Sequence, residues 1–258
     1  MSAALRGRLR AGEVTLGTFL NLGSPLAAEA CALAGFDWLL LDLEHGAGGE
    51  DALVGQLLAA AAHDVPVIVR VESAERIRAG RVLDAGAAGV MFPRLDTEEE
   101  ARDALAHLRY PPEGDRGIAT YNRACGFGLR SDVLDTANDD VIAVVQVETL
   151  SALEQVDAIA RAPGTDVLFV GPRDLSHALG VPGRFDAPEY REALDRVLAA
   201  TRAAGVAAGV LAADRDAADR YLADGFTFVA IGSDSGFIVA GARAAAARSA
   251  ARSPLAAS

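Results

Sequence analysis

Residues 34–45 read Ala-Gly-Phe-Asp-Trp-Leu-Leu-Leu-Asp-Leu-Glu-His, and this stretch decides the fold. A glycine that follows an alanine-rich helical pattern ends the helix in a left-handed conformation. The apolar run 38–43 comes next, and its lack of alternation is typical of a parallel strand that is buried on both faces. Asp42, Glu44 and His45 lie where this strand ends. The stretch therefore predicts a helix–turn–strand unit that carries polar side chains to the carboxyl end of a parallel strand.

The same unit recurs along the chain, with helical patterns between the apolar runs. The predicted strands span 16–20, 38–43, 65–71, 89–93, 141–147, 166–170, 206–210 and 226–231. The predicted helices span 25–34, 52–63, 74–85, 98–108, 151–160, 188–204 and 215–224. Eight strands with helical crossovers in 258 residues predict one (β/α)8 TIM-barrel domain over residues 1–258. An open doubly wound sheet is the alternative that fits the same alternation.

Two segments stand outside this repeat. Residues 108–140 separate the fourth and fifth strands and are rich in Pro, Gly, Tyr and Arg. Long connections in compact domains are often functional, so we expect an ordered loop near the barrel mouth. Residues 241–258 are rich in Ala and Arg and predict a C-terminal helical tail. Little core remains for this tail to join, so we expect it to pack on a neighbouring subunit.

Composition excludes several classes of protein. The formal net charge is −12 and the arginines form no basic stripe, which argues against binding to nucleic acid. No segment has the apolar length of a signal peptide or a membrane span, so a cytoplasmic protein is expected. The two cysteines, Cys31 and Cys125, do not make a disulfide framework in a chain of this length.

The absence of lysine restricts the chemistry further, because all 24 basic residues are arginine. A Schiff-base enzyme needs a lysine amine to condense with a carbonyl group. Pyridoxal phosphate (PLP) enzymes need the same amine, and a Walker-type phosphate loop needs its lysine. A Schiff-base lysine and PLP are therefore excluded.

Polar residues gather at the carboxyl ends of the predicted strands, where barrel enzymes place their active sites. The second strand ends in Asp42, Glu44 and His45, the third in Arg70, and the fifth in Gln146 and Glu148, and the sixth runs into Arg173 and Asp174. Residue type leaves two interpretations for each group.

Glu148 and Asp174 come from adjacent strands and would suit Mg²⁺ or Mn²⁺ with water ligands, or else would be loop-start or helix-cap residues. His45 is a candidate general base or a hydrogen-bonded structural group. Arg70 would pair with a buried carboxylate or face an anionic substrate.

A family resemblance covers nearly the whole chain. Its motifs are Ala34-Gly35-Phe36-Asp37-Trp38 leading to Asp42-Leu43-Glu44-His45-Gly46; Val69-Arg70-Val71; Leu83-Asp84-Ala85-Gly86-Ala87; Arg109-Tyr110-Pro111-Pro112 with Arg116-Gly117; Gln146-Val147-Glu148-Thr149; and Gly171-Pro172-Arg173-Asp174-Leu175-Ser176. Each motif is short, but their order and spacing together are very specific. In this combination the chain resembles the HpcH/HpaI aldolases, the class II pyruvate aldolases that include hydroxyheptanedioate and dehydrodeoxyglucarate aldolase.

The resemblance implies a role for each matching residue. Glu148 and Asp174 would hold a divalent cation, Mg²⁺, Mn²⁺ or Co²⁺. His45 would accept a proton, and Asp84 would raise its basicity. Arg70 would stabilise the enolate oxygen. Gln146, the backbone at Arg173, and Asp42 complete the implied substrate-binding set. Members of the family are typically trimer-based hexamers with swapped C-terminal helices, so a homo-oligomer is expected.

The resemblance also implies a reaction. A 4-hydroxy-2-oxo acid would be cleaved reversibly to pyruvate and an aldehyde through a metal-bound enolate. A lyase acting on CoA thioesters and a non-catalytic barrel that binds 2-oxo acids remain as alternatives. Two departures from the family pattern, Glu72 in place of proline and the Ala47-Gly48-Gly49 loop, concern the expected aldehyde pocket rather than the reaction.

Overall fold

A closed ring of eight parallel strands forms the centre of the protein. The computed structural model describes residues 2–130 and 132–250. The strands are β1 (Thr15–Leu20), β2 (Trp38–Asp42), β3 (Val67–Arg70), β4 (Gly89–Phe92), β5 (Ile142–Val147), β6 (Val167–Val170), β7 (Ala207–Ala212) and β8 (Phe228–Ser233). They follow one another around the ring, and β1 also pairs with β8. The predicted barrel is confirmed, and the open-sheet alternative is wrong.

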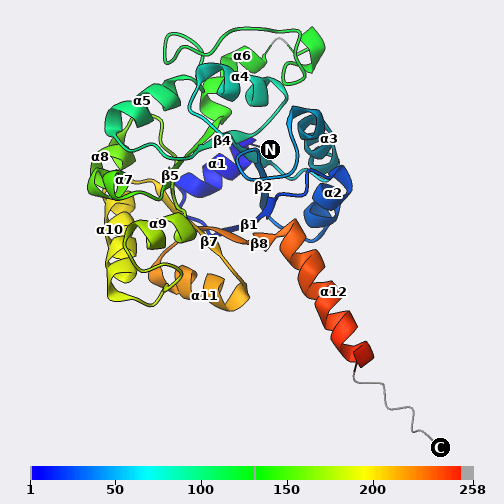
Figure 1. Ribbon diagram of the computed structural model, residues 1–258. Coiled ribbons are helices and arrows are strands. Elements are labelled where there is room, and N and C mark those ends of the chain that lie inside the picture. Colours follow the sequence, from blue (N-terminus) through cyan, green and yellow to red (C-terminus); the bar gives the residue numbers. More distant parts are fainter. Residues whose placement is uncertain (1, 131, 251–258) are drawn as a thin grey trace, which may run out of the picture.

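Helices surround this ring (Figure 1). They are α1 (Ser2–Arg10), α2 (Pro25–Leu33), α3 (Glu50–Ala61), α4 (Arg76–Asp84), α5 (Glu98–Ala106), α6 (Val133–Asp140), α7 (Leu150–Glu154), α8 (Val156–Arg161), α9 (Pro172–Ala178), α10 (Pro188–Ala204), α11 (Arg215–Asp224) and α12 (Asp234–Ala250), with a 3-10 turn at Gly126–Gly128. The predicted helix 151–160 is two helices, α7 and α8. Helices α1, α6 and α9 lie outside the predicted ones.

The barrel interior is a packed core that α1 closes at one end. Leu5 and Leu9 of α1 belong to the same buried cluster as Trp38, Phe169 and Phe228 from the strands. The Nε of Arg6 donates to the Asp166 carboxylate at 2.9 Å, and this pair is buried. Because Asp166 directly precedes β6, α1 covers the amino ends of the strands. The opposite end, where the strands finish, stays open for a site.

Trp38 shows how closely this interior is packed. Its ring is fully buried and stacks on Phe228, with the ring centroids 3.8 Å apart. The ring also lies directly over Gly17 of β1, where a β-carbon would stand 2.3 Å from it. A glycine is therefore required at position 17, because any side chain would occupy the space of the indole.

We expect Gly17→Ala to destabilise the protein by about 1–3 kcal/mol, the usual cost of overpacking a core. Urea unfolding would measure the loss, and near-UV circular dichroism would report the displaced indole. Gly80→Ala is the matched control, because a β-carbon at this position in α4 meets nothing within 4 Å. Alanine there should be neutral or should stabilise the helix by about 0.5–1 kcal/mol. Equal stability of Gly17→Ala and wild type would show that the interior is loosely packed.

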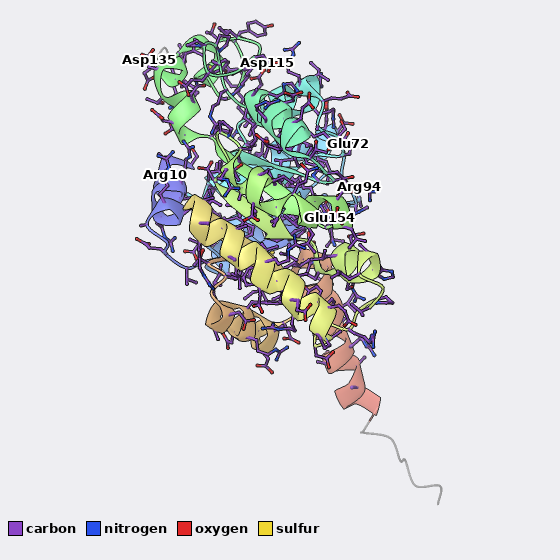
Figure 2. The ribbon with its side chains drawn as sticks, turned by 90° about the vertical axis from the view of Figure 1, so that its left-hand side faces the viewer. Arg10, Glu72, Arg94, Asp115, Asp135 and Glu154 are labelled. Atoms are coloured by element: carbon purple, nitrogen blue, oxygen red, sulfur yellow. The ribbon has the colours of Figure 1, made fainter. Side chains whose placement is uncertain are left out.

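The segment 108–140 lies at the amino ends of the strands, so its predicted place near the barrel mouth is wrong. Arg116 and Arg123 contact Asp84 and Ala85, which come just before β4. Figure 2 shows the two ends of the barrel from the side: Glu72 and Arg94, which follow β3 and β4, lie at one edge, and Arg10 lies at the other. Asp135 of α6 is on the Arg10 side.

Helix α12 leaves the barrel after β8 and extends away from it (Figure 1). Its first residue, Asp234, is buried and accepts hydrogen bonds from the backbone of Asn21 and Leu22. Apolar side chains near its start are exposed, namely Phe237, Ile238 and Val239. The helical part of the predicted tail lies within α12, and residues 251–258 lie outside the described residues. None of the helices in the described part of the chain is long and apolar enough to cross a membrane.

Candidate active site

A cavity of about 910 Å³ opens at the carboxyl ends of the strands. Six of the eight residues predicted for the site line it, namely Asp42, His45, Arg70, Gln146, Arg173 and Asp174. The seventh, Glu148, is not part of the lining but accepts a hydrogen bond from the side chain of Gln146, which is. The structure therefore brings seven of the predicted residues together and leaves one, Asp84, elsewhere.

Arg70 is the central cation of this site. Its Nε and Nη2 donate to the two oxygens of Asp42 at 2.9 and 2.7 Å, which is the bidentate geometry of a strong ion pair. Its Nη1 lies 3.3 Å from Glu44, and its guanidinium also stands over the ring of Phe19. Both side chains of the Arg70–Asp42 pair are buried. The Arg70 guanidinium is thus held in one orientation before any ligand arrives.

Asp42 holds the Arg70 guanidinium in position, and both of its oxygens already accept hydrogen bonds within the protein. One of its oxygens accepts from Arg70 Nε and from the backbone N–H groups of Glu44 and His45, at 3.1 and 3.3 Å. Its other oxygen accepts from Arg70 Nη2. The carboxylate therefore fixes both the guanidinium and the start of the loop that carries His45.

Gln146 connects Arg70 to Glu148. Its amide oxygen accepts from Arg70 Nη1 at 3.4 Å, and its amide nitrogen donates to Glu148. The other oxygen of Glu148 accepts from the backbone N–H of Arg94 at 3.0 Å. Arg94 has a left-handed backbone, with φ 52°, a conformation that is uncommon for arginine. This strained turn at the end of β4 aims an N–H group at the Glu148 carboxylate.

Glu148 lies in a buried, negatively charged environment. Desolvation raises the pKa of its carboxyl above the ordinary value, and the charges of Asp174 and Glu44 raise it further. Gly171 forms the adjacent wall, where a β-carbon would stand 2.8 Å from a Glu148 oxygen and 2.7 Å from the Gln146 amide nitrogen. Glycine at 171 leaves room for both side chains, so the carboxylates concentrate negative charge at one point of the cavity.

These carboxylates fit a divalent cation. Glu148 and Asp174 offer hard oxygen ligands, and a dication would relieve the repulsion that raises the pKa of Glu148. No cluster of three or more His, Cys, Asp or Glu in the described part of the chain has the geometry of a metal site. Two carboxylates alone still fit a Mg²⁺ site, in which water and substrate oxygens complete the set of ligands.

His45 and the α9 residues complete the rim. The His45 side chain is 70% exposed, and its Nε2 lies 3.7 Å from a Glu44 oxygen. Asp174 and Arg173 fall in the first turn of α9, which begins at Pro172. The first backbone N–H groups of a helix have no partner within it, so the N–H of Arg173 is free to bind a ligand. The His45 imidazole is thus accessible to a molecule in the cavity.

Asp84 is the predicted residue that the structure does not bring to the site. It ends α4, just before β4, and therefore lies at the amino ends of the strands. Its carboxylate accepts from Arg116 Nη2 at 2.8 Å. Within one chain it cannot raise the basicity of His45, which stands at the opposite end of the barrel.

Sequence reasoning missed two contributions to the site. Glu44 lies beside the predicted His45 and contacts Arg70, so its place after β2 was the available signal. The Arg94 N–H is a backbone group, and residue type carries no signal for it. The two departures from the family pattern lie outside the cavity lining: Glu72 pairs with Arg78 at 2.7 Å, and Gly48 packs on Gly23.

Comparisons with known proteins agree with this site. The family model described as HpcH/HpaI aldolase/citrate lyase matches residues 15–240. The chain is 41% identical over 236 residues to a hydroxypyruvate/pyruvate aldolase of Paraburkholderia phytofirmans, covering 89% of this chain and 91% of the relative. It is 40% identical over 231 residues to a 5-keto-4-deoxy-D-glucarate aldolase of Salmonella paratyphi C, covering 90% of each.

A solved structure is also similar to this protein over nearly the whole chain. The crystal structure of an HpcH/HpaI aldolase/citrate lyase family protein from Burkholderia cenocepacia superposes with a TM-score of 0.91 at 41% identity, and the match covers 95% of this chain and 98% of that one. The resemblance noted in the motifs is therefore confirmed along the chain. This protein belongs to the HpcH/HpaI aldolase/citrate lyase family and is a carbon–carbon lyase of the aldolase type.

Proposed function

We propose that this protein is a divalent-metal-dependent class II aldolase that reversibly cleaves a 4-hydroxy-2-oxo acid to pyruvate and an aldehyde. The observation that carries the proposal is the chain of contacts from Asp42 through Arg70 and Gln146 to Glu148. It holds the Arg70 guanidinium between the carboxylates of Asp42 and Glu148, and Asp174 and the exposed His45 line the same cavity. The relatives named as pyruvate and ketodeoxyglucarate aldolases support the same reaction class.

The residues divide the reaction between them. A dication held by Glu148 and Asp174 would act as a Lewis acid toward the 2-oxo acid. Arg70 places its positive charge where negative charge develops on the keto oxygen. Gln146 and the backbone N–H of Arg173 bind the pyruvate end, and Asp42 keeps Arg70 in place. His45 accepts the proton of the C4 hydroxyl as the carbon–carbon bond breaks, and returns it in the reverse direction.

Three finer features belong to this proposal. The cation is Mg²⁺, Mn²⁺ or Co²⁺, since carboxylate and water ligands accept each of them. The protein works in the cytoplasm as a trimer or hexamer, with the exposed apolar start of α12 packed on a neighbouring subunit. Asp84 pairs with Arg116 within its own chain, so a role toward His45 would require the Asp84 of a second subunit.

The test is pyruvate formation from a synthetic 4-hydroxy-2-oxo acid with and without EDTA. Turnover that EDTA abolishes and Mg²⁺ or Mn²⁺ restores supports the aldolase. Turnover of CoA thioesters alone would identify the thioester lyase instead. Tight binding of 2-oxo acids without any turnover would identify the non-catalytic barrel, and either of these last results would overturn the proposal.

Arg70→Lys should lower kcat by about 10²–10³-fold, the usual loss when one donor to a developing oxyanion is removed. Lysine keeps the charge but not the planar fork that bonds both oxygens of Asp42. Steady-state kinetics would give kcat, and calorimetric titration with Mn²⁺ should show little change in metal affinity. Full activity in this variant would remove Arg70 from the chemical step.

A further inference from the structure

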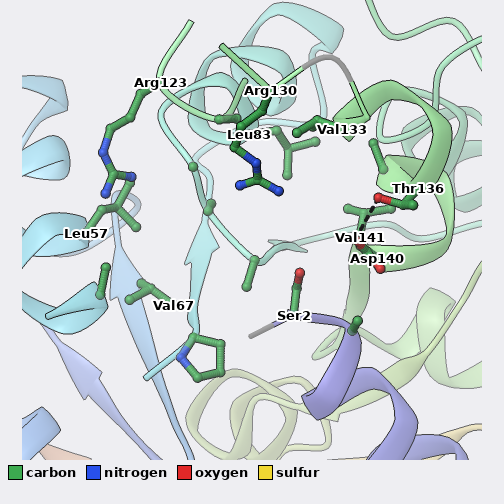
Figure 3. A pocket seen from close by; sticks show the side chains of 18 of the residues that line it. Ser2, Leu57, Val67, Leu83, Arg123, Arg130, Val133, Thr136, Asp140 and Val141 are labelled. Carbon is green, nitrogen blue, oxygen red and sulfur yellow. Dashed lines mark hydrogen bonds between the residues drawn. The ribbon is translucent and has the colours of Figure 1, made fainter. Parts of the chain in front are cut away.

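A second cavity, of about 390 Å³, lies at the amino ends of the strands. It is enclosed by α3, α4, the segment 108–140 and the start of α1, and Figure 3 shows it from close by. We propose that it binds a small organic anion, with a phosphate or carboxylate head on an apolar body. This proposal does not rest on the aldolase reaction, because the cavity is at the opposite end of the barrel from His45 and Glu148.

Three arginines line this cavity, and Arg116 is the most buried of them, with its side chain 6% exposed. Its Nη2 pairs with Asp84, and its guanidinium stacks over the Tyr110 ring at 4.5 Å. Its Nε is buried and has no hydrogen-bond partner among the described residues. A buried donor without a partner costs free energy, and an acceptor in the cavity would remove that cost.

Arg123 and Arg130 extend into the cavity from the loop above it (Figure 3). Arg123 Nη1 donates to the Ala85 carbonyl at 2.8 Å. Gly86, with φ 101°, makes this approach possible, because a β-carbon there would stand 2.4 Å from the same nitrogen. The Arg130 side chain lines the same cavity and is exposed to solvent. Two guanidinium forks are thus available to the same occupant.

The wall that carries these arginines is fixed in place. Asn138 of α6 accepts from the Tyr110 backbone N–H at 2.7 Å and donates to the Tyr110 carbonyl at 3.1 Å. Ala124 N–H donates to the Asp84 carbonyl at 3.0 Å. These bonds tie the long segment to α4 and α6, so the guanidinium groups need little reordering when an anion binds.

Charge and shape then select the class of ligand. The lining holds three guanidinium groups and one carboxylate, Asp140, which already accepts from Thr136 at 3.1 Å. This local positive excess stands out in a chain of net charge −12. Apolar side chains make up much of the rest of the wall, among them Leu57, Val65, Leu83 and Val133. Guanidinium forks recognise phosphate and carboxylate groups, and the apolar wall would cover a small hydrocarbon body.

Phenylphosphate is the probe for the test, because it joins a phosphate to a small ring. Calorimetric titration would use the full chain, with Mg²⁺ and excess oxalate added to compete for the cavity at the other end. We expect binding at least about tenfold tighter than that of inorganic phosphate or phenol alone, a difference of about 1.4 kcal/mol. Phenylacetate, run in parallel, tells whether the head group preferred is carboxylate or phosphate.

The variant Arg123→Gln/Arg130→Gln should weaken phenylphosphate binding by at least about tenfold while leaving thermal stability unchanged. Arg102→Gln/Arg161→Gln is the matched control, since it removes the same two charges from exposed positions on α5 and α8. It should bind like wild type. Absent binding in wild type, or equal binding in both double variants, would overturn the proposal.

Discussion

Glu148→Gln is expected to lower metal affinity by at least about 100-fold, since even residues that only support a metal ligand give losses of 10–100-fold. Turnover should fall with it, by about 10³-fold or more at ordinary metal concentrations. Glutamine retains an oxygen that accepts from the Arg94 N–H, so the fold of the site should survive. Mn²⁺ titration followed by electron paramagnetic resonance would measure affinity, and pyruvate release would measure turnover.

Glu154→Gln is the control for this experiment. Glu154 lies at the end of α7, on the surface, and its substitution removes the same charge away from the cavity (Figure 2). It should bind Mn²⁺ and turn over like wild type. Unchanged Mn²⁺ affinity in Glu148→Gln would show that the carboxylate pair is not the cation site.

Metal affinity should also depend on pH at the acidic side. Burial and the neighbouring charges raise the pKa of Glu148, so its carboxyl takes up a proton at a higher pH than an ordinary glutamate. A protonated carboxyl does not bind a dication. Mn²⁺ affinity should therefore fall as the pH is lowered through this raised pKa, and titrations between pH 8 and pH 4 would measure the fall. A constant Mn²⁺ affinity over that range would contradict the raised pKa of Glu148.

His45→Ala gives the second large effect. Loss of a general base costs about 10²–10⁴-fold in rate, so we expect kcat to fall within that range. Mn²⁺ affinity should stay within about twofold of wild type, because His45 donates nothing to the carboxylate pair and its side chain stands in solvent. Its exposure predicts a further result: added imidazole should restore part of the lost turnover.

His177→Ala is the matched control. His177 is an exposed residue of α9 close in sequence to Asp174, but it does not line the cavity. Its substitution should leave kcat unchanged. Equal activity of His45→Ala and His177→Ala would transfer the role of proton acceptor to another group.

The strands were the most predictable part of the molecule. Each of the eight apolar runs became a strand within two residues of its predicted start, because a strand buried on both faces must be apolar throughout. Helix α9 was missed because only Gly171 separates it from β6, and the polar Arg173 and Asp174 in its first turn look like a loop. Helix α1 was missed because its apolar residues, Leu5 and Leu9, face a barrel interior that no local pattern reveals.

The site was predictable where it consists of side chains at strand ends. Asp42 and Arg70 end their strands, Gln146 lies one residue before the end of β5 and Glu148 directly follows it, and the closed ring brings these ends together. Asp84 shows the reverse case. It precedes β4, so the direction of the parallel strands assigns it to the other end of the barrel, whereas the family resemblance implies a place beside His45.

The closure of the barrel by α1 at the amino ends of the strands has a consequence for protein synthesis. The buried cluster inside the barrel unites Leu5 and Leu9 with Phe228 and Ala230, which are made more than two hundred residues later. A nascent chain that lacks β8 has neither a neighbour for β1 on that side nor a complete lining for Leu5 and Leu9 to enter. The leucines of α1 therefore stay partly uncovered during synthesis until β8 has left the ribosome.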